Sequence, residues 1–368
     1  MYLTFFTNAA PYQITWEDIL NNPYISNNNL PKLPAKKVTK EISNEYAKSL
    51  WEKKRNDLTT LRIIAPLVDQ IENTEEHYRH FQIPKKSDPH KMRQIDAPDE
   101  QLAYVQAVYK AVIDDVLIFQ PHKAAHAYVK DRSIVTAMEV HQKNKSKWFL
   151  QIDLKDFFNS IDGIWLKDML MQVYPFPFIP EEDMDRMIKM SLLKGCLPQG
   201  SKLSPTLTNA VMVPIDHDLT ETLHNYNKHH YVYTRYADDI TISCKEKFDP
   251  DEILSVIKDI FSKWNVPFRI NHRKTRFGSS AGRNYHLGLI INKDNKISAG
   301  HEKNNKFKAM IFNFCMIGDE WEVQRIQHML GMISYYKSFE PDFVRRTIEK
   351  YNRKFNIDIM AKAKALIN

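Results

Sequence analysis

The chain has 368 residues, of which 43% are hydrophobic and 26% charged, and this composition predicts a globular protein of two to three compact units, or one large body with subdomains. Lysine and arginine exceed aspartate and glutamate by 52 − 45 = 7, a basic balance that fits a polyanionic partner such as nucleic acid without requiring one. The sequence has no Rossmann or P-loop fingerprint, no disulfide framework among its three cysteines, no signal peptide and no run of about 18 apolar residues. We therefore expect a cytoplasmic protein with no membrane partner.

The first part of the chain is predicted to pass from a polar arm into helix and hairpin. Residues 1–40 are rich in asparagine and proline, which indicates an N-terminal arm. From residue 39 to about residue 81, apolar residues recur at four-residue spacing among many charges, and this pattern predicts helix. The basic stretch IPKKSDPHKMRQIDAP at 83–98 is typical of a hairpin, and QLAYVQAVYKAVIDDVL at 101–117 predicts an amphipathic helix.

The middle and end of the chain mix strands and helices without a regular βαβ pattern. WFLQIDL at 148–154 predicts a buried strand, and residues 179–194 and the stretch TLTNAVMVPIDHDL predict helices. YVYTRY and ITIS are strand-like and flank residues 237–239, and EILSVIKDIFSKW has an apolar helical face. FRINHRKTRF and NYHLGLIIN are again strand-like, and the tail from about residue 302 is helical. The fold class predicted by this order is α+β.

Two adjacent carboxylates, Asp238 and Asp239, lie between the strands YVYTRY and ITIS. Like charges side by side repel by roughly 1 kcal/mol at about 4 Å in water, so the pair gains a purpose if cations neutralise it. Carboxylate oxygens suit Mg²⁺, and Asp153, which ends the strand-like run WFLQIDL, is the candidate for a third ligand. The residues alone leave an alternative open, in which the pair is solvated in a turn and Asp153 caps a helix.

Seven sequence blocks occur in the order of the motifs of one family, and the match covers roughly residues 78–314. In chain order they are IPKKSDPHKMRQIDAPDEQLAYVQ (83–106), HAYVKDRSI (126–134), QIDLKDFFNSI (151–161), LPQGSKLSP (197–205), YADD (236–239), NHRKT (271–275) and HLGLIIN (286–292). On these blocks the chain resembles bacterial reverse transcriptases, most of all the retron and phage-defence-associated (abortive-infection-like) enzymes. AMEVH at 137–141 and HLG at 286–288 keep only the histidine and only the glycine of two retron signatures, which leaves another defence lineage open.

The resemblance implies a right-hand polymerase with an antiparallel palm sheet. Its implied parts are an N-terminal arm at 1–40, fingers at 41–145, a palm at 146–300 with interleaved fingers and helical segments, and a thumb-like helical region at 301–368. The implied activity is RNA-directed DNA polymerisation, in which two Mg²⁺ ions (or Mn²⁺) about 3.5–4 Å apart serve the addition of deoxynucleotides to a primer.

The resemblance also assigns roles to individual residues. Asp153, Asp238 and Asp239 are implied to be the metal ligands, and Lys274 lies where the family has a lysine beside the leaving pyrophosphate. Phe158 takes the position of a steric gate against the 2′-hydroxyl, whereas we assign Phe157 to packing. The other implied nucleotide-binding residues are Arg93, Arg132, Gln199, Gly200 and Tyr236. The implied nucleic-acid-binding residues are Lys85, Lys86, Arg345, Arg346, Lys350, Arg353 and Lys354.

The partners implied by the resemblance are an RNA template, which in this group is a structured non-coding RNA, the DNA product and dNTPs. An effector protein or a second copy of the chain is a further candidate partner. Two other functions stay open from the sequence: a template-independent or protein-primed nucleotidyltransferase, and a non-catalytic RNA-binding scaffold of polymerase ancestry.

Overall fold

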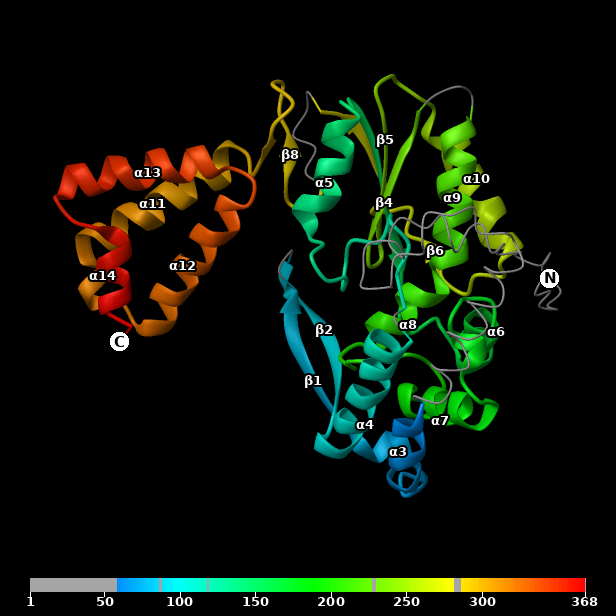
Figure 1. Cartoon of the computed structure of the whole chain (residues 1–368). Coiled ribbons are helices and arrows are strands. Elements are labelled where there is room, and N and C mark those ends of the chain that lie inside the picture. The colour runs from blue at the N-terminus through cyan, green and yellow to red at the C-terminus, as the bar shows by residue number, and fades with distance from the viewer. Residues whose placement is uncertain (1–57, 86–87, 118, 227–229, 281–285, 368) are drawn as a thin grey trace, which may run out of the picture.

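The computed structural model describes residues 58–367 except residues 86–87, 118, 227–229 and 281–285 (Figure 1). The predicted N-terminal arm and the first part of the predicted helical stretch therefore lie outside the described residues. The described residues form α-helices and antiparallel strands, which confirms the α+β class. None of their helices is long and apolar enough to cross a membrane.

The first described elements are a short helix, a hairpin and a longer helix. In chain order they are α3 (Thr59–Asp69), η1 (Thr74–His77), β1 (Tyr78–Lys85), β2 (Asp88–Pro98), α4 (Glu100–Ala111), the π-helical η2 (Val112–Val116) and α5 (Ile134–Lys143). The predicted hairpin is confirmed, because β1 pairs with β2 antiparallel. The prediction of helix up to residue 81 was wrong at its end, since Tyr78–Phe81 belong to β1 and pair with Ile95–Pro98. Pairing with β2 determines the conformation of this segment, and the local periodicity of the sequence does not reveal such a pairing.

The central region contains the largest sheet. Its elements are β3 (Trp148–Lys155), α6 (Gly163–Leu170), η3 (Phe176–Phe178), α7 (Glu181–Ser191), α8 (Ser204–Val211), α9 (Val213–Asn225), β4 (Val232–Tyr236), β5 (Asp239–Cys244), α10 (Pro250–Lys263), β6 (Arg269–Ile270), β7 (Arg276–Ser279), β8 (Ile290–Ile291) and β9 (Ile297–Ser298). The strand order is β4-β5-β3-β6, with β7 also paired to β3, and every pairing is antiparallel. The strand-like runs FRINHRKTRF and NYHLGLIIN contribute only strands of two to four residues.

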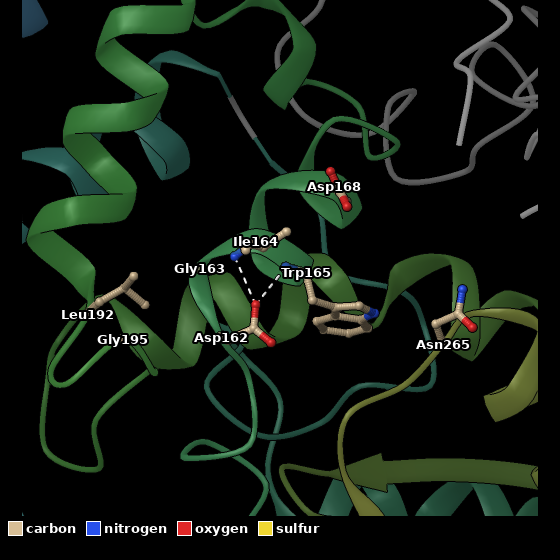
Figure 2. Close-up of a pocket in the computed structure, with 8 residues that line it drawn as sticks. All are labelled: Asp162, Gly163, Ile164, Trp165, Asp168, Leu192, Gly195 and Asn265. Atoms are coloured by element: carbon tan, nitrogen blue, oxygen red, sulfur yellow. Dashed lines mark hydrogen bonds between the residues drawn. The ribbon is translucent and has the colours of Figure 1, made fainter. Parts of the chain in front are cut away.

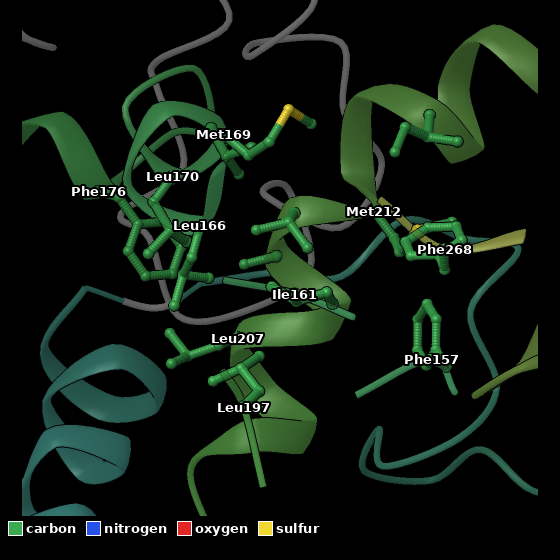
Figure 3. Close-up of a cluster of buried hydrophobic side chains, with 14 of the residues drawn as sticks. Phe157, Ile161, Leu166, Met169, Leu170, Phe176, Leu197, Leu207, Met212 and Phe268 are labelled. Atoms are coloured by element: carbon green, nitrogen blue, oxygen red, sulfur yellow. The ribbon is translucent and has the colours of Figure 1, made fainter. Parts of the chain in front are cut away.

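The sheet is buried on both faces, which explains why WFLQIDL reads as an almost continuous apolar strand. Helices α9 and α10 pack beside the sheet, and α5 lies against β4 (Figure 1). Beyond the end of β3, Phe157 is buried and packs edge-on against Phe268 at 5.0 Å. Figure 3 shows these two rings beside the apolar cluster of Ile161, Leu197 and Leu207. This core fixes the chain that leaves β3.

The C-terminal region is a helical body with its own apolar core. Its elements are α11 (His301–Ile317), η5 (Gly318–Glu320), α12 (Val323–Lys337), α13 (Pro341–Phe355) and α14 (Ile359–Ala365). The ring of Phe307 stacks on Tyr336 at 4.4 Å, and the same cluster reaches Met138 of α5 and Phe149 of β3. The helical tail is therefore confirmed, whereas the boundaries at 40, 145 and 300 stay predictions.

Candidate active site

The hairpin β4–β5 places the acidic pair at its turn. Tyr236 and Asp239 are paired residues, so Ala237 and Asp238 form the turn between them, and Ala237 has a left-handed backbone with φ 56°. Asp153 is the cross-strand partner of Asp239 in the pairing of β3 with β5. The backbone N–H of Leu154 donates to the Asp238 carbonyl at 2.9 Å. Paired Cα atoms lie about 4.5–5.5 Å apart, so the fold brings together three aspartates from two distant segments.

Two side chains hold the carboxylate of Asp153. The Lys274 ammonium donates to Oδ1 at 2.6 Å, and the Asn271 amide donates to Oδ2 at 2.9 Å. The Asp153 side chain is 14% exposed and that of Lys274 61% exposed. The backbone N–H of Asn271 also donates to the Asp153 carbonyl at 2.8 Å, which fixes this loop to the end of β3. Sequence reasoning predicted Lys274 here and missed Asn271, although NHRKT was one of the recognised blocks.

Burial and neighbouring carboxylates raise the pKa of both Asp238 and Asp239. For Asp238, burial is the main cause of a raised pKa, and Asp153 adds to it, whereas Lys274 and Arg93 oppose it. Asp239 keeps contact with solvent, yet partial burial and the carboxylates of Asp238 and Asp153 raise its pKa to about 7. The cluster is thus short of positive charge even with Lys274 in place.

These oxygens fit divalent cations by their chemistry, because Mg²⁺ prefers carboxylates and binds through one or two of them together with substrate phosphates. In the described part of the chain, however, no three His, Cys, Asp or Glu side chains are arranged around a common point as they stand. Both oxygens of Asp153 are engaged by Lys274 and Asn271. The residues that would hold ions are therefore adjacent, and binding requires these side chains to rotate.

The loop with Gln199 and Gly200 lies against the base of the β1–β2 hairpin. The N–H of Asp96 donates to the Gln199 carbonyl at 2.8 Å. Gly200 has φ +131°, and a Cβ there would meet the Asp96 carbonyl oxygen at 2.6 Å. A close backbone approach is thus present at Gly200, and its partner is the β1–β2 hairpin, which lies in the predicted fingers region and is called the fingers hairpin below. Arg93, exposed on β2 of the same hairpin, is near enough to oppose the raised pKa of Asp238.

Arg132 has a structural contact that the sequence did not indicate. Its NH1 donates to the carbonyls of His122 at 2.8 Å and Ala125 at 2.7 Å, so this guanidinium braces the loop before α5. Binding of a triphosphate by Arg132 stays a prediction. Phe158 is partly buried, and its ring lies 6.5 Å from the ring of Tyr128.

Tyr128 is a residue that sequence reasoning missed. Its side chain is 59% exposed, and its backbone has φ 59°, which is an outlier for an aromatic residue. Burial raises the pKa of Tyr128, with contributions from Asp238 and Tyr236. Tyr128 thus lies beside Phe158, and the sequence does not reveal its left-handed backbone. Tyr236 itself is half-buried.

Figure 2 shows a pocket elsewhere on the molecule, around the start of α6. Ile164, Trp165 and Leu192 form its apolar part, and Asp162 caps α6 by accepting from two backbone N–H groups. None of the site residues predicted from the sequence lines it. It plays no part in the site built here.

The described residues among the cations predicted to bind nucleic acid lie on two elements, β1 and α13. Lys85 is the last residue of β1, and Lys86 lies outside the described residues. The other five are exposed on α13: Arg345, Arg346, Lys350, Arg353 and Lys354. Arg345 pairs with Asp342 at 2.9 Å, while Lys354 lies over the ring of Phe312 at 5.1 Å. On α12, Tyr335 is 37% exposed, and partial burial raises its pKa, with a further contribution from Tyr236 of the β4–β5 hairpin.

Comparison with known proteins decides the family. The family model described as "Reverse transcriptase (RNA-dependent DNA polymerase)" matches residues 83–317, a range that includes all three aspartates and Lys274. The chain belongs to the reverse transcriptase family. It is thus an RNA-directed DNA polymerase, and its fold is the expected right-hand polymerase.

Several relatives that match most of the chain are retron enzymes. The Retron Ec73 reverse transcriptase of Escherichia coli is 30% identical over 73% of this chain and 87% of its own length. The Retron Ec86 reverse transcriptase of the same organism is 27% identical over 84% of this chain and 90% of its own. The Retron Mx65 reverse transcriptase of Myxococcus xanthus is 27% identical over 73% of this chain and 63% of its own. These matches identify the reverse transcriptase as retron-type, despite its departures at 137–141 and 286–288.

Proposed function

We propose that Asp153, Asp238 and Asp239 hold two Mg²⁺ ions and that the enzyme extends a primer with dNTPs on an RNA template. The observation that carries this proposal is the direct cross-strand pairing of Asp153 with Asp239 beside the turn that holds Asp238. When bound, such ions would supply Lewis-acid activation of the primer hydroxyl and neutralise charge on the phosphates. Mn²⁺ satisfies the same donor set.

The surrounding side chains bind and orient the nucleotide in this proposal. Arg93 lies on the hairpin that faces Asp238 and grips the triphosphate, because a guanidinium suits phosphate oxygens. Lys274, released from Asp153, places its ammonium at the leaving pyrophosphate. The ring of Phe158 closes the ribose side against a 2′-hydroxyl. Gln199 and Gly200 support the base beside the fingers hairpin.

The template proposed is a structured non-coding RNA, and the biological role proposed is phage defence in the cytoplasm. The support for this template is the group of retron relatives, whose identity with this chain extends over most of its length. The five cations on α13 are proposed to follow a phosphate backbone, since they are exposed on one helix.

The test is to purify the protein with its bound nucleic acid and to sequence the RNA and DNA, for the natural chain and for Asp238→Ala. We expect complementary DNA attached to one RNA species in the natural sample and a loss on the order of 100-fold or more in the variant. Asp156→Ala is the matched control, because this exposed aspartate follows the same strand.

Equal DNA in the Asp238→Ala and natural samples would overturn the proposed role of the aspartates. DNA that matches no bound RNA would instead indicate template-independent transfer. DNA that stays attached to protein after ribonuclease treatment would indicate protein priming.

A further inference from the structure

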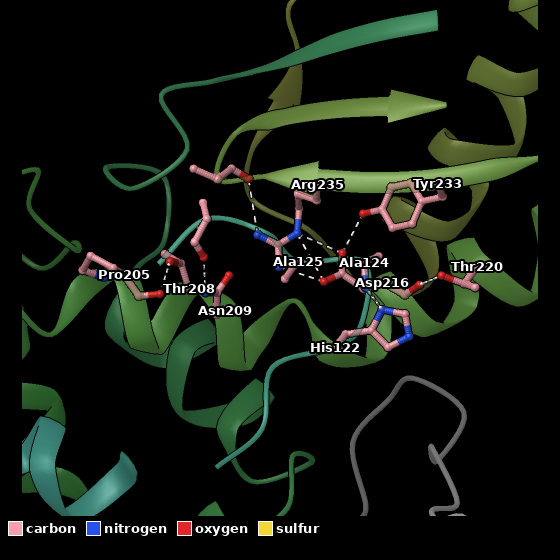
Figure 4. Close-up of polar contacts among 12 residues, drawn as sticks. His122, Ala124, Ala125, Pro205, Thr208, Asn209, Asp216, Thr220, Tyr233 and Arg235 are labelled. Carbon is pink, nitrogen blue, oxygen red and sulfur yellow. Dashed lines mark hydrogen bonds and ion pairs between the residues drawn. The ribbon is translucent and has the colours of Figure 1, made fainter. Parts of the chain in front are cut away.

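Directly behind the catalytic turn lies a charged side chain that is fully removed from solvent. Arg235, on β4, and Asp216, on α9, are both 0% exposed. Arg235 donates through Nε to Asp216 Oδ1 at 2.9 Å and through NH2 to Asp216 Oδ2 at 2.7 Å, and Tyr233 donates its hydroxyl to Oδ1 at 2.6 Å. Figure 4 shows this group between the strand and the helix. Such a pair is costly to bury and adds little to stability, which points to a purpose beyond stability.

The remaining contact of the guanidinium points to that purpose. NH1 of Arg235 donates to the Ala237 carbonyl at 3.3 Å. Ala237 is the turn residue that precedes Asp238, and its φ of 56° is unfavourable for a residue with a side chain. Such backbone persists only where the surroundings fix it. A buried donor aimed at its carbonyl supplies that constraint.

The backbone of Arg235 is fixed as firmly as its side chain. Its N–H donates to the Ala124 carbonyl at 2.7 Å, and its carbonyl accepts from the N–H of His126 at 2.8 Å. The 122–126 segment that provides these bonds is itself held by Arg132. The guanidinium therefore sits at a defined place between α9 and the turn.

We propose that Arg235 is a positioning residue, which holds the Ala237 carbonyl so that Asp238 and Asp239 are presented together to the catalytic ions. Asp216 orients the guanidinium for this purpose. The inference rests on the proposed role of the aspartates. It adds that the geometry of the turn, and not the two carboxylates alone, sets the affinity for divalent cations and the turnover.

The experiment separates positioning from stability with two variants that make opposite predictions. The triple variant Tyr233→Phe, Asp216→Leu, Arg235→Met replaces the whole polar group by apolar side chains, a change that buried ion pairs often tolerate. Ile215→Ala removes buried apolar atoms from the same helix α9 and leaves every polar atom of the group in place. Readouts are melting temperature, Mn²⁺ affinity by electron paramagnetic resonance without substrate, and kcat and KM for dTTP on poly(rA)–oligo(dT).

For the triple variant we expect a melting temperature near that of the natural chain, kcat lower on the order of 10- to 100-fold, and weaker Mn²⁺ binding. For Ile215→Ala we expect a lower melting temperature, because a cavity forms in the core, with Mn²⁺ affinity and kcat within about twofold of the natural values below that temperature. Tyr233→Phe alone should behave like the natural chain in kcat.

A folded triple variant with unchanged kcat and Mn²⁺ affinity would overturn the proposal. Should that variant not fold, Arg235→Lys gives the same comparison. One ammonium keeps the charge beside Asp216 but cannot also reach Ala237, so unchanged values in this variant likewise count against positioning. Asp238→Ala is the reference variant. If Asp238→Ala binds Mn²⁺ as the natural chain does, the proposed metal site is wrong. If Asp238→Ala binds Mn²⁺ weakly but the positioning variants bind it normally, only the inference about Arg235 is wrong.

Discussion

Two β-hairpins carry most of the residues proposed to handle the nucleotide, and the protein holds them in different ways. The catalytic hairpin β4–β5 is buried along most of its length, and His141 of α5 ties its strands to the helix through Thr234 at 2.8 Å and Ser243 at 2.6 Å. The fingers hairpin β1–β2 exposes apolar side chains, with Phe81 at 47% and Met92 at 46%.

The fingers hairpin is anchored at its base. There the N–H of Asp96 bonds to the Gln199 carbonyl, and the N–H of Asp99 bonds to the His77 carbonyl at 2.7 Å. The difference matches what each hairpin is proposed to do. Carboxylates that share ions must be placed within about 0.5 Å, whereas a hairpin that grips a triphosphate has to open and close around it.

The largest expected effect is at Phe158, which follows β3, the strand that pairs with the catalytic hairpin. Phe158→Ala removes the ring that is proposed to meet a 2′-hydroxyl, so rNTP incorporation relative to dNTP should rise on the order of 10- to 100-fold. Steady-state incorporation of dTTP and UTP opposite the same template base measures this ratio. Phe157→Leu is the control, because Phe157 is 3% exposed and packs in the core, so it should lose stability and keep the ratio. An unchanged ratio in Phe158→Ala removes this residue from the gate.

The anchored base of the fingers hairpin is tested at Gly200. In Gly200→Ala the new Cβ meets the Asp96 carbonyl oxygen, which has to move, so we expect a loss of about 1–3 kcal/mol in stability and a raised KM for dNTPs. Chemical denaturation and incorporation kinetics measure the two effects. Gly195→Ala is matched, since its φ is +79° and its Cβ would meet no atom within 4 Å. Equal losses in both variants would show that strain alone, and not the contact with the hairpin, is responsible.

The hydrogen bonds by which His141 attaches the catalytic hairpin to α5 can be tested by lowering the pH. Burial lowers the pKa of His141 to about 3 and that of His286 also to about 3, so the native state keeps both rings neutral. An unfolded chain binds their protons below about pH 6.5, and the free energy of unfolding therefore falls by about 1.4 kcal/mol per pH unit per histidine between pH 6.5 and the native pKa.

Melting temperatures should fall from about pH 6.5 to pH 4.5, because the two histidines outweigh the opposite contribution of Asp239, whose raised pKa stabilises the native state as the pH falls below about 7. His141→Gln keeps hydrogen bonding without a titrating ring, so its curve should fall less steeply. His301→Gln, at an exposed site at the start of α11, is expected to change nothing. A slope that is identical in His141→Gln and the natural chain would mean that another group controls the acid sensitivity.

How much of this was predictable from the sequence depends on whether a residue's role is local. Asp153, Asp238 and the β1–β2 hairpin could be predicted, because each sits in a short block with its own pattern. Asn271 and Asp216 could not, since each acts on a residue far away in the chain, Asp153 and Arg235 respectively. In the sequence, Asp216 looks like an exposed position on a helix, and its burial becomes evident only when β4 packs beside α9.

Gly200 stands between these two cases. The family resemblance implies that it lies at the nucleotide, but only the fold shows that its close backbone neighbour is Asp96.

The smallest expected effect is in the thumb, where single cations add little to binding. Arg346 is exposed on α13, and its Nε donates to the Asp342 carbonyl at 3.2 Å, which leaves the helix surface charged. If it contacts a phosphate, Arg346→Ala should reduce the slope of log affinity against log salt by about 0.7–0.9 and weaken RNA binding only a few-fold. Fluorescence anisotropy with a labelled RNA duplex at several salt concentrations measures the slope. Lys306→Ala on α11, whose ammonium pairs with Glu302 at 2.7 Å, is the matched control and should keep it. An equal change in both would mean that the thumb attracts nucleic acid by its overall charge and not through α13.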